Sequence, residues 1–356
     1  MKTSFGCHPK WNLLRAPVGF AVAAALVFAL VGFAHQAGSA RSPILYDTLA
    51  DPDRIEEATH LGAMPVLLVY QSVDPESTKT GEIDIPAVLS AIERMTDGHP
   101  PAWGVLDFEE PFFKWLDMAP DSPEFAKATT TLVRLIEMVR RTFPGTKWAF
   151  YGIPMLPYWD HGSSWDVMDE QAKRRLLDRC IVASRKILES SDWVCPSVYL
   201  FYDPAMFPEH DRVGIQLAGR IWRSATVRIA KLLAGQKPVI PVTSPLWMEI
   251  GKAPAGAIVP NVQFRVDGLQ PLVEAKADGI MIWTALSYKV NRVTSPDCPP
   301  SERRSILRSL TPGQTNDAGQ SQLPDKSVLR RAAGQVIIES IQEARAALAA
   351  KVTVAP

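Results

Sequence analysis

The stretch GVLDFEEPFFKWL, residues 104–116, places three acids at the end of a short apolar strand. These acids are Asp107, Glu109 and Glu110, and aromatic side chains follow them directly. Burying carboxyl groups at the end of an apolar run costs free energy unless something there uses them. Alternate residues of a strand project to one face, so Asp107 and Glu109 point one way and Glu110 the other. The stretch therefore predicts a strand that delivers two carboxyl groups to one place.

The rest of the chain from residue 43 alternates short apolar runs with amphipathic segments. This alternation indicates a parallel sheet covered by helices. The predicted strands are residues 43–46, 64–70, 103–108, 147–152, 193–200, 237–242 and 279–283. The predicted helices lie near residues 52–62, 84–96, 122–142, 166–190, 210–234 and 267–277.

Two architectures fit this alternation, an open doubly wound sheet and a closed barrel. A doubly wound nucleotide-binding protein usually carries a glycine fingerprint after its first strand, and residues 44–52 contain no glycine. The residues that look functional gather at the carboxyl ends of several strands, where a (β/α) barrel carries its chemistry. We therefore predict a (β/α) barrel with seven recognisable strands.

Residues 1–40 differ from the rest of the chain. Three basic residues precede an apolar run at residues 16–34, and small residues end the segment at Ala40. This order predicts a secretory signal peptide that is cleaved after Ala40, and the alternative is an uncleaved N-terminal membrane anchor. Either way, we expect the protein to be secreted or extracytoplasmic.

The remaining chain divides into a predicted catalytic barrel, residues 41–300, and a C-terminal loop and helix, residues 301–356. The predicted helix covers residues 326–352 and is rich in alanine, arginine and glutamate. We expect its apolar face to pack on the barrel. That face comprises Val328, Leu329, Val336, Ile337 and Ile341.

Composition excludes several classes of function. Of the 356 residues, 47% are hydrophobic and 21% charged, as in an ordinary globular protein. Without residues 1–40 the chain keeps 35 basic and 38 acidic residues, a net charge of −3, so no global positive field attracts nucleic acid. Cys180, Cys195 and Cys298 remain, which allows at most one disulfide, and no Cys or His spacing predicts a metal site. No cofactor is expected.

The two acids and the aromatic residues together indicate carbohydrate chemistry. A glycosidase uses one carboxyl group to protonate the leaving oxygen and a second, ionised one nearby, and repulsion between adjacent carboxylates raises the pKa of one of them. Sugar rings stack on aromatic side chains, and tyrosine hydroxyl groups bind their polar edges. The alternative is solvated acids at a strand end and aromatic residues in the core. The aromatic residues are Trp103, Phe112, Phe113, Trp115, Tyr151, Tyr158, Trp159, Trp165, Tyr199, Tyr202 and Trp283.

Four segments resemble strand motifs of the hyaluronidases, glycoside hydrolase family 56. They are WGVLDFEE (103–110), WAFYGIP (148–154), CPSVYL (195–200) and DGIMIWTALSYKVN (278–291), and they occur in the order that the family has. KPVIPVT (237–243) is a weaker match. The resemblance implies a distorted (β/α)7 TIM-like barrel, here with an extra C-terminal helix. It also implies retaining, substrate-assisted hydrolysis, in which the acetamido oxygen of the sugar replaces an enzyme nucleophile.

The resemblance also implies roles for individual residues. Glu109 takes the place of the acid/base glutamate, and Asp107 that of the aspartate that positions the N-acetyl group. Tyr151 and Tyr199 would hydrogen-bond the acetamido group or nearby hydroxyl groups, and Trp283 would form a wall against the acetyl methyl. Two further residues, Ser197 and Asn291, match motif positions, whereas Glu110 is expected to be structural.

The chain departs from the family at several positions. Phe112 stands where the family has an arginine, and WTAL (283–286) stands where the family has WGSS. The family disulfides lack partners in this chain. The missing arginine and the acidic net charge weaken the prediction of hyaluronan relative to a neutral polymer.

The sequence therefore predicts an exported, endo-acting hydrolase of N-acetylhexosamine bonds, with hyaluronan as the leading substrate and chondroitin next. One alternative is a hydrolase of a neutral amino-sugar polymer, either chitin-like or peptidoglycan-like. Another is a catalytically silent carbohydrate-binding protein on the same scaffold. The predicted partner is a polysaccharide, with no nucleic acid, and with a membrane only if residues 16–34 stay as an anchor.

Overall fold

The computed structural model describes residues 42–47, 55–156, 168–248, 258–284, 286–295 and 326–350, together with residues 298, 303 and 307. The predicted signal peptide or anchor at residues 1–40 lies outside the described residues, as does most of the predicted loop at residues 301–325. The division into a signal, a barrel and a C-terminal region stays a prediction.

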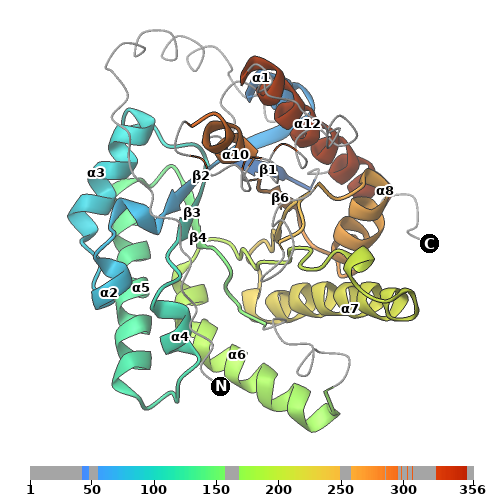
Figure 1. The fold of residues 1–356 in the computed structure, drawn as a ribbon. Coiled ribbons are helices and arrows are strands. Elements are labelled where there is room, and N and C mark those ends of the chain that lie inside the picture. The colour runs from blue at the N-terminus through green and yellow to red at the C-terminus, as the bar shows by residue number, and fades with distance from the viewer. Residues whose placement is uncertain are drawn as a thin grey trace. The chain divides into compact units, whose positions relative to one another are not determined.

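A six-stranded sheet forms the centre of the described fold, and every neighbouring pair of its strands is parallel. The strand order is β4-β3-β2-β1-β6-β5, and helices surround these strands (Figure 1). The predicted parallel α/β architecture is thereby confirmed. The strands are β1 (Ile44–Asp47), β2 (Ala63–Tyr70), β3 (Trp103–Asp107), β4 (Lys147–Phe150), β5 (Val242–Thr243) and β6 (Ile280–Ile282).

The predicted strand at residues 193–200 is not regular. It makes isolated parallel bridges to both edges of the sheet, from Cys195 to Tyr151 beyond β4 and from Ser197 to Val242 in β5. Pro196 has no N–H to donate to a ladder, and the predicted strand at residues 237–242 contains two more prolines. The prolines explain why pairing here is intermittent and why β5 is only two residues long.

Helices occupy the predicted segments, and side-chain caps fix the starts of three of them. They are α1 (Ile55–His60), α3 (Ile85–Thr96), α5 (Pro123–Thr142), α6 (Glu170–Ser190), α7 (Glu209–Ala234) and α12 (Lys326–Ala350). Asp84, Ser122 and Asp169 each accept a hydrogen bond from a first-turn backbone N–H, and thereby fix the starts of α3, α5 and α6. None of the helices among the described residues is both long and apolar enough to cross a membrane.

Further helical segments, most of which have no counterpart in the sequence prediction, occupy the connections. They are α2 (Ser77–Thr80), α4 (Phe112–Leu116), α8 (Asn261–Gln263), α9 (Gln270–Glu274), α10 (Leu286–Val293), the 3₁₀ segments η2 (Gln71–Val73) and η3 (Pro204–Met206), and the π-helix η4 (Phe264–Leu269). The segment from α8 to α9 overlaps the helix predicted near residues 267–277. A π-helical turn interrupts it, which an apolar period cannot reveal.

Helix α12 packs on α10, η4 and the strands β1 and β6, as the apolar face of its sequence predicts. Leu329, Ile337 and Ile341 are buried in this contact. The prediction was wrong for Val328, which is 42% exposed, because the buried stripe begins one residue later.

Close packing between β3 and β4 depends on a glycine. Gly104 pairs with Trp148, whose side chain is fully buried. A β-carbon on Gly104 would lie 2.5 Å from two ring atoms of Trp148. The ring therefore occupies the space that any larger residue at position 104 would need, and this holds β3 in its register.

We predict that Gly104→Ala lowers the free energy of unfolding by about 1–3 kcal/mol, because the buried indole ring has no room to move. Chemical denaturation would measure the change. Gly145→Ala is the matched control, because a β-carbon there meets nothing within 4 Å, and it should change stability by less than about 0.5 kcal/mol. Equal stability of the two variants would contradict this account of the β3–β4 contact.

Candidate active site

The register of the sheet brings polar side chains together at the carboxyl ends of its strands. Asp107 ends β3 and pairs with Tyr70, the last residue of β2. Tyr151 follows Phe150, which pairs with Leu106, so that Tyr151 lies level with Asp107. These positions form one edge of a parallel sheet, which is where α/β barrels carry their active sites.

Asp107 and Glu109 form the acidic centre of this edge. The two side chains are joined by a hydrogen bond, and Asp107 Oδ1 is buried with no hydrogen-bond partner. The pKa of Asp107 is raised well above its usual range, first by burial and then by the charge of Glu109 and the hydrogen bond with it. The two carboxyl groups therefore retain one proton between them above the pH at which an ordinary aspartate ionises.

Three aromatic side chains form a second component, here called the aromatic wall: Tyr151, Tyr199 and Trp283. The ring centroids of Tyr151 and Tyr199 lie 6.1 Å apart, and those of Tyr199 and Trp283 lie 5.6 Å apart. Tyr151 Oη donates to Ser197 Oγ at 3.2 Å. The structure thus brings together four of the residues that the sequence singled out.

The acidic centre and the aromatic wall lie close enough to interact electrostatically. Burial raises the pKa of Tyr151 well above its usual value, and the charges of Glu109 and Asp107 raise it further. The pKa of Tyr199 is also raised, first by burial, with a contribution from Asp107. Both phenols therefore remain protonated and keep their hydroxyl groups as hydrogen-bond donors.

Sequence reasoning missed two residues of this site, Asp47 and Tyr70. Trp283 Nε1 donates to Tyr70 Oη at 2.9 Å, and Tyr70 Oη donates to Asp47 Oδ2 at 3.0 Å. Asp47 also contributes to the raised pKa of Asp107. Each residue ends a strand, β1 or β2, so the strand-end rule that found Asp107 could have found them as well.

Several aromatic residues that were expected near a sugar lie elsewhere, because they pack in or against the hydrophobic core. Phe112 is fully buried in α4 and meets Trp115 edge-on. Trp115 also packs against the position of Gly81, and Trp103 packs against Trp193 at the opposite end of β3.

The other aromatic residues lie near loops or outside the described residues. Phe113 packs against Gly152, and Tyr202 contacts Phe201 and Phe207. Tyr158, Trp159 and Trp165 lie outside the described residues, as does the side chain of Asn291. Glu110 is exposed, and its expected structural role stays a prediction.

Two further predictions concern disulfides and metal ions. Cys180, Cys195 and Cys298 are buried, and Cys180 and Cys195 are free thiols. Burial raises the pKa of Cys180 to about 11, which makes the thiolate scarce at neutral pH. Within the described ranges, no group of three His, Cys, Asp or Glu residues could hold a metal ion.

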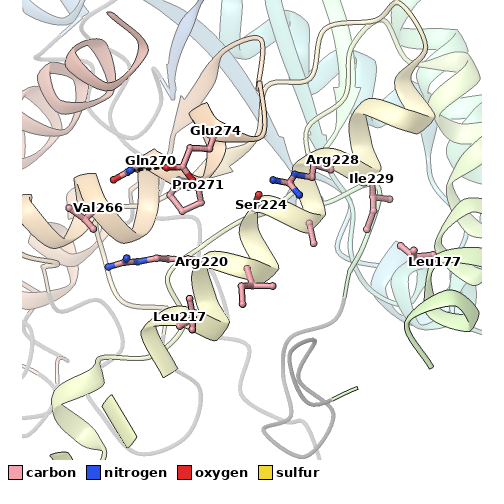
Figure 2. A pocket seen from close by; sticks show the side chains of 12 residues that line it. Leu177, Leu217, Arg220, Ser224, Arg228, Ile229, Val266, Gln270, Pro271 and Glu274 are labelled. Atoms are coloured by element: carbon pink, nitrogen blue, oxygen red, sulfur yellow. Dashed lines mark hydrogen bonds between the residues drawn. The ribbon is translucent and has the colours of Figure 1, made fainter. Parts of the chain in front are cut away.

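A hollow of about 500 Å³ lies away from the acids, between α6, α7 and the segment of η4 and α9 (Figure 2). Its charged residues include Arg220, whose Nε donates to the buried Asp267 at 2.5 Å. Two other lining residues are hydrogen-bonded to each other: Gln270 Nε2 donates to Glu274 Oε1 at 2.7 Å. Its lining lacks the pair of acids that the strand ends provide, so volume alone does not make it the candidate active site.

The fold and the site together define an α/β protein with acids and phenols converging at the carboxyl edge of a parallel sheet. The sequence matches no protein-family model, and no curated protein matches it. Solved structures that resemble it include a monoclinic crystal structure of bee venom hyaluronidase. That structure shares 15% identity, with 75% of this chain and 95% of that chain covered, at a TM-score of 0.48.

A second solved structure is bee venom hyaluronidase in complex with a hyaluronic acid tetramer. It shares 16% identity over 75% of this chain and 94% of that chain, at a TM-score of 0.47. At these identities and TM-scores the likeness carries no conclusion about fold or chemistry.

We predict that Asp107→Asn stabilises the protein at neutral pH. The raised folded-state pKa means that the protonated carboxyl is favoured in the folded state, and this stabilisation is lost as the pH rises through that pKa. Asparagine cannot ionise, so the variant should gain about 0.5–2 kcal/mol at pH 7–8. Its advantage should shrink as the pH falls toward about 4, where an unfolded aspartate protonates. Thermal unfolding across this range would measure it, and a pH-independent difference would contradict the prediction.

Proposed function

We propose that this protein is a glycoside hydrolase that cleaves β-linked N-acetylhexosamine bonds inside a polysaccharide. Hyaluronan is the leading substrate and chondroitin the next. The observation that carries the proposal is the buried, unpartnered Oδ1 of Asp107, which lies beside Glu109 and interacts with the aromatic wall. A buried acceptor without a partner costs free energy, and a substrate N–H would satisfy it.

Glu109 is the acid and base of the proposed reaction. It donates its proton to the glycosidic oxygen as the bond to the anomeric carbon breaks, and it later removes a proton from the incoming water. The proton shared by Asp107 and Glu109 supports this role. When a substrate N–H donates to Asp107 Oδ1, ionised Asp107 is stabilised, and the shared proton is held by Glu109.

The nucleophile in this proposal belongs to the substrate. The acetamido oxygen attacks the anomeric carbon and forms an oxazolinium ion, whose N–H is held by ionised Asp107. Water then attacks the same carbon from the side that the leaving group vacated, so that the configuration is retained. The arrangement of the acids supports this scheme, because two hydrogen-bonded carboxyl groups leave no room for a sugar ring between them.

The aromatic wall would hold the acetamido group for this attack. Protonated Tyr151 and Tyr199 are donors for its carbonyl oxygen or for nearby hydroxyl groups, and Trp283 offers an apolar face to its methyl. Ser197 orients Tyr151, since Ser197 Oγ accepts a hydrogen bond from the Tyr151 hydroxyl group. No cofactor enters the scheme.

The finer prediction for the fold belongs to the same proposal. We propose a distorted (β/α)7 TIM-like barrel in which residues 193–200 serve as the seventh strand between β4 and β5. The bridges from Cys195 to Tyr151 and from Ser197 to Val242 support it. Export of the protein, with residues 1–40 as a signal or an anchor, is likewise proposed from the sequence alone.

One observation favours a second candidate substrate, a neutral amino-sugar polymer of the chitin or peptidoglycan type. Phe112, which occupies the position of an arginine in the resembled motif, is fully buried and packs edge-on against Trp115. This position therefore offers no cation to a uronic acid carboxylate. A catalytically silent carbohydrate-binding protein is the remaining alternative.

Digestion of hyaluronan, chondroitin and chitin oligosaccharides by the full chain would test the proposal, with reducing-end release as the readout. We predict cleavage of at least one polymer, and a loss of about 10²–10⁴-fold in rate for Glu109→Gln, which cannot donate the proton. Glu110→Gln is the matched control, because Glu110 is exposed and adjacent, and it should keep the wild-type rate within a few-fold.

The outcomes separate the three candidates. Cleavage of hyaluronan or chondroitin supports the leading proposal, and cleavage of chitin oligosaccharides alone supports the neutral polymer. Binding without cleavage of any polymer would support the silent protein. Full activity of Glu109→Gln would refute the proposed mechanism on any substrate.

A further inference from the structure

The side chain of Gln71, the residue after β2, is hydrogen-bonded to the loop that carries Glu109. Its Oε1 accepts hydrogen bonds from the backbone N–H of Glu109 at 3.0 Å and of Glu110 at 3.1 Å. Its Nε2 donates to the backbone carbonyl of Glu110 and to Ser77 Oγ, the latter at 2.9 Å. Sequence reasoning did not single out this residue.

These four hydrogen bonds use the complete capacity of the amide. Its oxygen offers two lone pairs and its nitrogen two N–H groups, and each has a partner. A carboxylate could keep the two accepted bonds but could not donate to the Glu110 carbonyl. An apolar side chain of the same length would keep none of the four.

A buried network supports the amide from the other side. Ser77 is fully buried, and its hydroxyl donates to the carbonyl of Asp74 at 2.7 Å. Asp74 Oδ2 in turn accepts the backbone N–H of Asp84, the N-cap of α3, at 2.8 Å. Gln71 is thus linked through Ser77 and Asp74 to the start of α3.

The backbone of Glu109 needs this support because its own strand has ended. The β2–β3 ladder stops at the pair Tyr70 and Asp107, where β2 turns into the 3₁₀ segment η2. The next regular element, α4, begins at Phe112. Between these points the side chain of Gln71 replaces the partner strand, and it extends the pairing to Glu109 and Glu110.

We propose that Gln71 is a positioning residue for the acid/base Glu109. It fixes the backbone of Glu109 and Glu110, so that the Glu109 carboxyl is held against Asp107 and Tyr151. The role of Glu109 in this inference rests on the proposed function. The hydrogen bonds between the Gln71 side chain and the backbone of Glu109 and Glu110, here called the clamp, do not depend on that function. A group that must transfer a proton gains rate from such fixed geometry.

Hydrogen–deuterium exchange tests the clamp without any substrate. In Gln71→Met the amides of Glu109 and Glu110 should exchange about 10-fold faster or more, while the peptides of β1 and β4 keep their protection. Gln335→Met is the matched control, because Gln335 makes a single exposed side-chain bond, to Glu339 on the same helix, α12. Unchanged exchange of the two amides in Gln71→Met overturns the inference, whatever the activity.

Steady-state kinetics on the cleaved polymer test the consequence. Gln71→Met should lower kcat about 10–100-fold with KM changed less than about 3-fold, because it loosens the acid and not the sugar-binding wall. Gln71→Glu keeps the two accepted bonds and adds a negative charge near Glu109. The activity of Gln71→Glu should therefore decline at a higher alkaline pH than that of the wild type, which a merely structural residue would not cause.

The results separate this inference from the proposed function. A wild-type protein that cleaves no polymer refutes the proposed function, and the exchange of the Glu109 and Glu110 amides still decides whether the clamp exists. Faster exchange with an unchanged kcat, or a pH profile that Gln71→Glu leaves in place, would overturn the positioning role. Thermal unfolding of each variant shows whether it is folded, and Gln71→Glu provides the test if Gln71→Met is not.

Discussion

Burial of the Asp107 carboxyl group at the end of β3 is the constraint on which the site depends. An acid in an apolar surrounding next to another acid is unfavourable when both are ionised, and the shared proton with Glu109 relieves this cost. The surrounding strand ends then supply hydroxyl groups in place of cations, through Tyr70, Tyr151 and Tyr199. The site therefore contains a hydrogen-bond acceptor without a donor, Asp107 Oδ1, and a carboxyl proton, shared with Glu109, that can be transferred.

This arrangement implies a conflict between stability and function. Asp107 Oδ1 has no hydrogen-bond partner in the free protein. A buried position normally holds either an apolar group or a polar group that is hydrogen-bonded. Proteins tolerate such groups mainly where a ligand completes them. Tight packing elsewhere, for example Trp148 over Gly104 beneath the site, keeps the unfavourable group in place.

Part of this account could be predicted from the sequence, because it depends on periodicity. The strand period predicted Asp107 at the carboxyl end of β3, and strand–helix alternation indicated the parallel sheet, which the structure confirms. Glu109 lies beyond the end of β3, so its hydrogen bond with Asp107 depends on the following loop and not on the strand period. Asp47 and Tyr70 could have been found as strand-end residues. The hydrogen bond between them and the contacts of Gln71 could not be predicted, since they depend on which strands become neighbours. Phe112 was open to two interpretations, as a sugar platform or as a core residue, and only its burial decides between them.

The most direct test is an infrared titration of the carboxyl groups, with the difference between the wild type and Asp107→Asn isolating the pair. Our account predicts that the wild type keeps one protonated carboxyl well above pH 4, the range in which ordinary aspartates and glutamates ionise, and that this signal is lost in Asp107→Asn. Ionisation of all carboxyl groups in the ordinary range would contradict it. The acids would then be two independent, solvated groups, and the proton that the mechanism needs would not be stored between them.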